Sequence, residues 1–180
     1  MRMVSNSWGG PPSSTYQSAI NSMDALGIKI VFSAGNSGPS CQTMTSPGDY
    51  TNVISVGSTT IDNALSSFSS CGQCNSGLIA PTIVAPGSDI LSAWKTSDTA
   101  YRAISGTSMA CPHVSGLAAL MLKKNPGLSF NQLKSAITSG AQKANLVTPN
   151  QSCGGTTASQ WPNNMLGYGR IDCEQTMKLI

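Results

Sequence analysis

The sequence predicts an α/β fold, in which a mostly parallel sheet carries helices on both faces. Three observations lead to this prediction. Short apolar segments alternate with segments of helical periodicity along the chain. Segment 28–34 has the pattern of a buried strand and ends at the turn-forming residues 35–38. The later part of the chain is helical, and strands that alternate with helices form parallel sheets covered on both faces.

The first helix is expected to follow Ser14 or Thr15, because either side chain can cap a helix N-terminus. Gly27 would end this helix by adopting a left-handed conformation. The apolar residues between these two signals share one helical face: Tyr16, Ile20, Met23 and Leu26.

The remaining elements also have local signals. Apolar runs bounded by Gly, Pro, Ser or Asn predict strands at 28–34, 53–56, 83–85, 90–94 and 101–104. A long helix is expected from about Ser108 to Lys124, where residues 125–127 stop it. Another helix begins at Ser129, whose spacing from Gln132 forms a capping box. Segment 150–155 is expected to be a surface loop.

Composition argues against a nucleic-acid or membrane partner. The chain has 180 residues, enough for one domain with a sizeable core, and only 9% of them are charged. Its net charge of +3 is spread along the sequence rather than gathered in a basic patch. No apolar run approaches the ~20 residues that a membrane span requires.

Cysteine content indicates an oxidising compartment. The chain has six cysteines, an even number and a large one for a cytosolic protein, which predicts two or three disulfides in a secreted or extracellular protein. The pairing stays open. The sequon at 150–152 agrees with secretion. Cys71 and Cys74 have the spacing of a redox or zinc motif, but their Ser- and Gly-rich surroundings favour a disulfide-stabilised loop. Cys111 is expected to be a buried apolar residue.

Ser108 stands between a predicted strand and the long helix, directly after Gly106 and Thr107. The first backbone N–H groups of a helix have no intrahelical acceptor, and the field there favours a developing anion. Ser108 can therefore supply a nucleophilic hydroxyl and one oxyanion donor, as acyl transfer requires. Because an ordinary helix cap would look the same, the interpretation needs a second signal.

Two further segments supply it. Asn36 ends the buried strand 28–34 among small residues, so its amide N–H can point at a carbonyl oxygen held over Ser108. A turn residue that tolerates positive φ is the alternative interpretation. Segment 6–10 is expected to be extended. Its backbone is not covered by side chains at Gly9 and Gly10, so it can pair with a substrate strand.

These segments resemble the subtilisin-like serine proteases (subtilases, peptidase S8 family). "GTSMACPHVSGLAAL" is similar to the family's nucleophile segment, "SAGNSG" to its oxyanion-asparagine segment and "SNSWGG" to its substrate-binding strand. "VISVGS", "SSFSSCG", "VAPG" and "WPNNMLGYGRID" also resemble family segments, so the likeness covers nearly the whole chain. The resemblance implies that Ser108 is the nucleophile and Asn36 the side-chain oxyanion donor. It also implies a substrate-binding backbone edge and pocket wall made of Ser7, Trp8, Gly9, Ala34 and Gly35.

The expected general base is missing from the sequence. A serine hydroxyl needs a base, and subtilases place an Asp and a His before the nucleophile. Neither segment occurs between residues 1 and 36. The only histidine, His113, lies about 140° and 7.5 Å further along the helix and is expected to be structural. The carboxylates at Asp49, Asp62, Asp89 and Asp98 have no motif near Ser108 and are expected in solvated loops.

We therefore expect residues 1–180 to form a single partial subtilase catalytic domain, the C-terminal portion of a subtilisin-like fold that is incomplete at the N-terminus. The predicted function is a serine endopeptidase that is inactive as this isolated fragment. The alternative is a non-catalytic, peptide-binding or structural fragment that needs an N-terminal partner. An α/β-hydrolase esterase is disfavoured, because that fold needs a His downstream of G-x-S-x-G.

Partners and cofactors follow from the same reasoning. Missing strands would leave apolar sheet edges uncovered, which predicts association with an N-terminal fragment or a second copy, besides a peptide substrate. No cofactor is expected. The resemblance makes structural calcium possible, but the acidic residues do not form a cluster with oxygen-ligand spacing.

Overall fold

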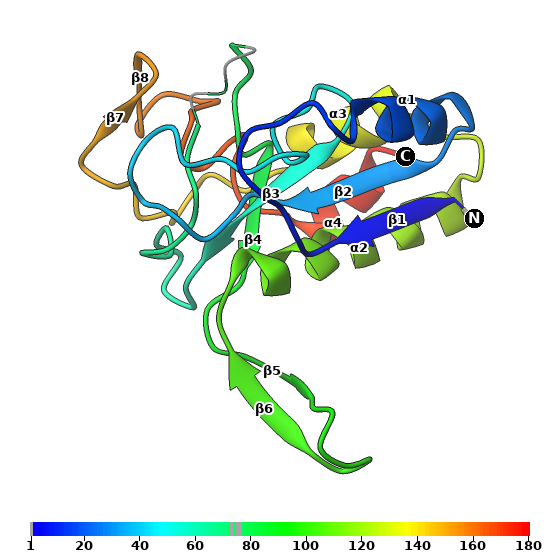
Figure 1. The fold of residues 1–180 in the computed structure, drawn as a ribbon, viewed down its shortest axis with the longest axis horizontal. Helices are drawn as coiled ribbons and strands as arrows, with labels where there is room; N and C mark the ends of the chain where they lie inside the picture. Colours follow the sequence, from blue (N-terminus) through cyan, green and yellow to red (C-terminus); the bar gives the residue numbers. More distant parts are fainter. Residues whose placement is uncertain (1, 73, 75–76) are drawn as a thin grey trace.

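A computed structural model describes residues 2–72, 74 and 77–180. Its centre is a sheet of four parallel strands, β1 (Met3–Asn6), β2 (Lys29–Ser33), β3 (Ile54–Thr59) and β4 (Ile83–Pro86). The strands follow one another in the order β1-β2-β3-β4, so β1 and β4 form the edges (Figure 1). All residues of β2 and β3 are buried, as expected for inner strands of a parallel sheet.

Helices lie on both faces of this sheet, which confirms the predicted fold class. Within β2, Val31 packs in one core cluster with helix α2 (Thr107–Lys124) and helix α3 (Phe130–Ser139). The neighbouring Ile30 and Phe32 pack in another cluster with Ile20 of helix α1 (Gln17–Ala25). Successive side chains of a strand point to opposite faces, so α1 and α2 cover opposite sides.

Helix α2 positions the nucleophile segment. It begins after the extended Gly106, one residue earlier than predicted, and runs along the sheet to Lys124, with Asn125 as its C-cap (Figure 1). Its buried face follows helical spacing: Ala110, Val114, Leu117, Ala118 and Met121. Pro112 lies inside the helix and has no N–H to donate to the Ser108 carbonyl, which accepts from the Ser7 hydroxyl at 2.9 Å instead.

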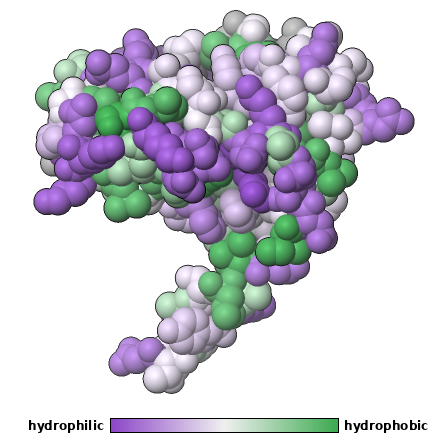
Figure 2. Space-filling view, turned by 180° about the vertical axis from the view of Figure 1, so that it is seen from behind, coloured by the Kyte–Doolittle hydropathy of each residue, from purple (hydrophilic) through white to green (hydrophobic). Residues whose placement is uncertain are grey.

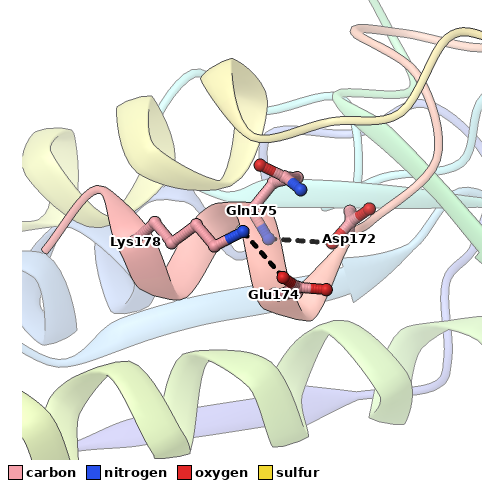
Figure 3. Close-up of polar contacts among 4 residues, drawn as sticks. All are labelled: Asp172, Glu174, Gln175 and Lys178. Carbon is pink, nitrogen blue, oxygen red and sulfur yellow. Dashed lines mark hydrogen bonds and ion pairs between the residues drawn. The ribbon is translucent and has the colours of Figure 1, made fainter.

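Helix α3 has the predicted capping box. The Ser129 hydroxyl accepts from the Gln132 N–H at 3.2 Å, and the Gln132 Oε1 accepts from the Ser129 N–H at 2.9 Å. A last helix, α4 (Cys173–Lys178), had no sequence prediction. Its Asp172 cap accepts from the Gln175 N–H, and Lys178 pairs with Glu174 one turn earlier (Figure 3).

The prediction that Ser14 or Thr15 caps the N-terminus of helix α1 is wrong. Tyr16 occupies the N-cap position without a side-chain hydrogen bond, while the hydroxyls of Ser13 and Thr15 bond to each other. The apolar face is also only partly covered, because Leu26 is 77% exposed. The predicted left-handed stop is present, since Gly27 has φ of 72°.

Two predicted strands form a separate hairpin instead of joining the parallel sheet. Strands β5 (Ile90–Ala93) and β6 (Tyr101–Ile104) pair antiparallel and project away from the body of the molecule (Figure 1). The Arg102 guanidinium lies over the Trp94 ring, 4.9 Å from its centroid.

The cysteines form one disulfide, Cys41–Cys153, rather than two or three. Segment 150–155 lies at the surface as predicted, except that Cys153 is buried and that β7 (Ser152–Cys153) pairs with β8 (Thr156–Thr157), which follows the segment. The other four cysteines are free, Cys71, Cys74 and Cys111 in the interior and Cys173 at the surface. In the described ranges, no helix is both long and apolar enough to span a bilayer.

Candidate active site

Ser108 lies at the N-terminus of α2, at the carboxyl end of the parallel sheet. Its side chain is partly exposed, and its hydroxyl donates to the carbonyl oxygen of Ser7 at 3.2 Å. The Ser7 hydroxyl in turn donates to the Ser108 carbonyl oxygen at 2.9 Å. These reciprocal bonds hold the first turn of α2 against the segment that follows β1.

Asn36 is fixed by the residue before Ser108. Its Oδ1 accepts from the Thr107 backbone N–H at 2.8 Å and from the Thr107 hydroxyl at 2.9 Å. The Thr107 side chain also contacts both the N–H and the carbonyl of Gly35 at 3.2 Å. Because the amide oxygen is occupied, the amide nitrogen is the end of Asn36 that is available to a ligand.

The two expected donors converge on one place. An ideal Cβ built on Gly106 would lie 3.6 Å from Asn36 Nδ2 and 3.6 Å from the Ser108 backbone nitrogen. The N–H groups of Met109 and Ala110 donate to the Gly106 carbonyl, whereas the Ser108 N–H has no acceptor among residues 2–72, 74 and 77–180. The space beside Gly106 can therefore take an acceptor oxygen between two unused donors.

The segment after β1 lies beside the segment after β2, because these two strands are neighbours in the sheet. Trp8 is 46% exposed and packs edge-on against Phe32 of β2 and against Tyr16. Gly9 lies against the Thr45 side chain. In the segment after β2, Ala34 is fully buried and Gly35 has a positive φ of 110°. The structure thus brings all predicted site residues to the same end of the sheet.

His113 lies on the exposed surface of α2, and the Ser108 hydroxyl bonds to the Ser7 carbonyl rather than to this imidazole. Its Nδ1 contacts the Met109 carbonyl at 2.8 Å. It also lines a groove of about 500 Å³ between α2 and the β5–β6 hairpin, with Trp94, Arg102 and Ile104. Nothing in these contacts turns the imidazole toward Ser108.

The prediction for Asp49 is wrong in one respect. Asp49 lies in a turn and is partly exposed, but its Oδ1 is buried and has no hydrogen-bond partner in the described part of the chain. Asp49 also raises the pKa of the Cys74 thiol, after the larger effect of burial. The described residues contain no group of three or more His, Cys, Asp or Glu that could hold a metal ion.

The free buried cysteines are poor nucleophiles. Burial raises the pKa of Cys71 to about 12 and that of Cys74 to about 11. The pKa of Cys111 is raised as well, because burial outweighs its hydrogen bonds from Ser5 and its neighbours. Since the thiolate is the reactive form, these groups stay inert near neutral pH. The expected disulfide at Cys71 and Cys74 is absent from the structure.

Comparison with known proteins places this arrangement in a family. The model of the subtilase family of peptidases matches residues 1–169. The chain belongs to the subtilase family. This match confirms the resemblance to the family, and the matched range includes Ser108 and Asn36.

Comparisons with individual proteins support the family assignment. The chain is 39% identical over 175 residues to Subtilisin BL from Lederbergia lenta, covering 97% of this chain and 55% of that protein. It is 38% identical over 168 residues to Alkaline serine exoprotease A from Vibrio alginolyticus, covering 93% of this chain and 28% of that protein. The chain thus spans about half of the first relative and less of the second.

Two solved structures share the fold. Sphericase superposes with a TM-score of 0.77 at 34% identity, covering 94% of this chain and 56% of that one. The prenylagaramide maturation protease PagA superposes with a TM-score of 0.76 at 23% identity, covering 99% of this chain and 61% of that one. The second likeness concerns the fold alone.

Sequence reasoning missed the roles of Thr107 and Thr45 around the site. Thr107 orients the Asn36 amide, and its position directly before the serine could have suggested a positioning role. Thr45 lies between two segments that are far apart in sequence, so no local pattern indicates it. Both are polar residues whose hydroxyls bond to backbone carbonyls next to Asn36, at Gly35 and Ala34.

Proposed function

We propose that this subtilase chain carries the nucleophile and the oxyanion donors of a serine endopeptidase. In this proposal the Ser108 hydroxyl attacks the scissile carbonyl and forms an acyl-enzyme. The Ser108 N–H and the Asn36 amide N–H stabilise the negative charge that develops on the carbonyl oxygen. The observation that carries the proposal is the convergence of both nitrogens beside Gly106, where each lies 3.6 Å from one point.

Substrate would bind along segment 7–9 as an added strand. The backbone after β1 leads directly to Ser7, whose carbonyl contacts the Ser108 hydroxyl. A peptide paired with this edge would bring its scissile carbonyl to the start of α2. Ala34 and Gly35 would form the opposite wall of the space that receives the adjacent side chain.

The general base would come from outside the residues described here. His113, the only histidine, contacts the Met109 carbonyl and faces the hairpin groove. We therefore propose that residues 1–180 form one partial catalytic domain, its C-terminal portion, and that a preceding segment with the Asp and the His completes it. In subtilisin itself, loss of the catalytic His costs about 2 × 10⁶ in kcat, so the chain alone should be nearly inert.

Two uncovered surfaces flank Ser108 and suit such a segment. β1 lies at an edge of the sheet. The groove beside the hairpin is lined by apolar residues, and Leu91 on the hairpin is 68% exposed. Figure 2 shows apolar surface where the hairpin joins the body. The occupant proposed is the N-terminal part of the same catalytic domain; a second copy of the chain is the competing outcome.

The second candidate function is peptide binding without cleavage. Peptide binding would use the same backbone edge, segment 7–9, and the same N–H donors at Ser108 and Asn36, but it would need no general base. The reciprocal bonds between Ser7 and Ser108 favour it for the isolated chain, because the hydroxyl is held by a carbonyl acceptor rather than by a base. We also propose a secreted or extracellular location, in line with the disulfide and with a relative named extracellular serine proteinase from a Thermus species.

Turnover of a fluorogenic peptide by the purified chain tests this proposal. We expect no turnover above the Ser108→Ala variant, because the base is missing. When the chain is expressed together with an N-terminal segment that carries the Asp and the His, turnover should appear and should vanish with Ser108→Ala. Robust turnover by the chain alone that Ser108→Ala abolishes would contradict the missing base. Turnover that survives Ser108→Ala in both cases would contradict Ser108 as nucleophile.

A further inference from the structure

Segment 7–9, the proposed substrate-binding edge, depends on helix α2 for its position. The pairing of β1 with β2 ends at Asn6, which lies opposite Phe32. The next backbone bonds of this stretch are at Gly10, which exchanges two with Ser46. Between these points the Ser7 carbonyl accepts from the hydroxyl at the start of α2, at 3.2 Å. The position of the edge therefore depends on how the end of β1 is fastened to α2.

Two further side chains of α2 lie on the helix face that carries Ser108. Cys111 and Ser115 follow it at positions i+3 and i+7, the spacing of one helical face. Cys111 is fully buried, and Ser115 is only 7% exposed. The Cys111 Sγ lies 3.5 Å from the Asn6 carbonyl oxygen. The Ser115 hydroxyl lies 2.8 Å from the Ser5 hydroxyl oxygen. Both residues thus contact the last two residues of β1.

These groups can form one directional chain of hydrogen bonds. The Ser115 hydroxyl donates to the Ser5 hydroxyl oxygen. The Ser5 hydroxyl then donates to the Cys111 Sγ, 3.7 Å away, and the thiol donates to the Asn6 carbonyl oxygen. Each group gives its single proton to the next, and the chain ends on the backbone directly before Ser7. Because linked hydrogen bonds polarise one another, loss of one link weakens the others.

We infer that Cys111 and Ser115 are positioning residues for the peptide site, because they hold the end of β1 against α2 and so fix segment 7–9 relative to Ser108. The inference rests on the proposed function, since it assumes that a peptide pairs with segment 7–9. Neither side chain contacts the peptide; both act through β1. A peptide that binds the edge and the start of α2 together needs the two in fixed relative positions, and ordering a loose edge costs affinity.

NMR titration of the labelled chain with an N-acetyl tetrapeptide acid tests the inference without a need for turnover. Cys111→Ala removes the donor to the Asn6 carbonyl, and Ser115→Ala removes the start of the chain of hydrogen bonds. Each variant should raise the Kd at least about threefold, as expected for a lost hydrogen bond. The double variant should lose less than the product of the two effects, because linked residues are not additive. Cys111→Ser keeps a donor and should stay within about twofold of wild type.

Val114→Ala is the control for a purely structural role. Val114 is fully buried in the same helix and packs in the core cluster, but it has no polar group to join the chain of hydrogen bonds. The variant should lower the urea midpoint, because it removes buried methyl groups. The Kd of the peptide should stay at the wild-type value.

The outcomes separate the inference from the proposed function. Wild-type affinity in folded Cys111→Ala and Ser115→Ala variants would overturn the inference and leave the peptide site standing. Equal losses of affinity in Cys111→Ala and Val114→Ala would overturn it as well, because affinity would then follow stability alone. If the wild-type chain binds no peptide, the proposed site fails, and the inference falls with it.

Discussion

Thr107 donates both its backbone N–H and its hydroxyl to the amide oxygen of Asn36, at 2.8 and 2.9 Å. This pairing fixes which end of the amide faces the site, because the oxygen is turned to Thr107 and the nitrogen is left for a ligand. A residue next to the nucleophile thus positions the side chain that is proposed to share the oxyanion.

Thr107→Val tests the orientation. The variant removes the hydroxyl that bonds to Asn36 and to both backbone groups of Gly35, so the partly buried Gly35 N–H loses its partner. We expect the free energy of unfolding to fall by about 1–3 kcal/mol, measured by urea denaturation. The affinity for a product-like peptide acid should fall several-fold. Thr107→Ser keeps the hydroxyl and should stay close to wild type; equal losses in both variants would contradict the role of the hydroxyl.

Gly106→Ala separates stability from binding. The added methyl would meet no atom closer than 3.6 Å, and the backbone at Gly106 is extended, so the fold should tolerate it within about 0.5 kcal/mol. The same methyl would occupy the point between the Asn36 and Ser108 nitrogens. Binding of a peptide acid should weaken at least tenfold, as measured by NMR titration.

Gly116→Ala is the matched control for that variant. Gly116 lies in the same helix, is exposed, and has open space around its Cα. Alanine should raise helix stability by up to about 1 kcal/mol and leave peptide binding unchanged. Unimpaired binding by Gly106→Ala would contradict the placement of the oxyanion beside Gly106.

The uncovered surfaces around Ser108 predict association. The edge strand β1 and the groove that includes Ile90, Leu91 and Ile104 expose apolar and unpaired groups. Light scattering of the purified chain should show dimers or larger species, and co-expression with the N-terminal segment should replace them with a one-to-one complex. A chain that stays monomeric alone and with that segment would contradict the proposed docking surface.

Stability should decline at alkaline pH. Burial raises the pKa of Cys71 to about 12 and that of Cys74 to about 11, from about 9 in an unfolded chain. The folded state therefore binds more protons than the unfolded state between these values. The contribution of each thiol is fully present below pH 9 and decreases by about 1.4 kcal/mol per pH unit as pH rises toward the folded pKa. Chemical denaturation across this range should show the decline, and Cys71→Ala should make it shallower.

The sequence predicted the α/β fold because its signals are local. The capping box at Ser129 and the buried run before Asn36 are visible within a few residues, and both are present in the structure. The hairpin β5–β6 could be predicted as two strands but not as a separate sheet, because strand partners are set by tertiary packing. The cysteine count similarly indicated disulfides, yet Cys41 and Cys153 form a single pair and the other four cysteines are free.

The candidate site also contains some residues that local sequence reveals and others that it does not. Ser108 and Asn36 were found from their places at element ends, and the structure brings them together. Thr45 escaped notice because its contacts with Gly9 and Gly35 join three separate segments. Asp49 was predicted to lie in a solvated loop, but its Oδ1 is buried, because no local pattern reveals how the rest of the chain packs over this turn.

The convergence of Ser108 and Asn36 is tested most directly by NMR titration of the chain with an N-acetyl tetrapeptide acid. The peptide carboxylate stands in for the oxyanion, so the backbone amide of Ser108 and the side-chain amide of Asn36 should shift together and saturate at the same peptide concentration. A shift of one amide without the other, or saturable binding that leaves both unmoved, would contradict the account.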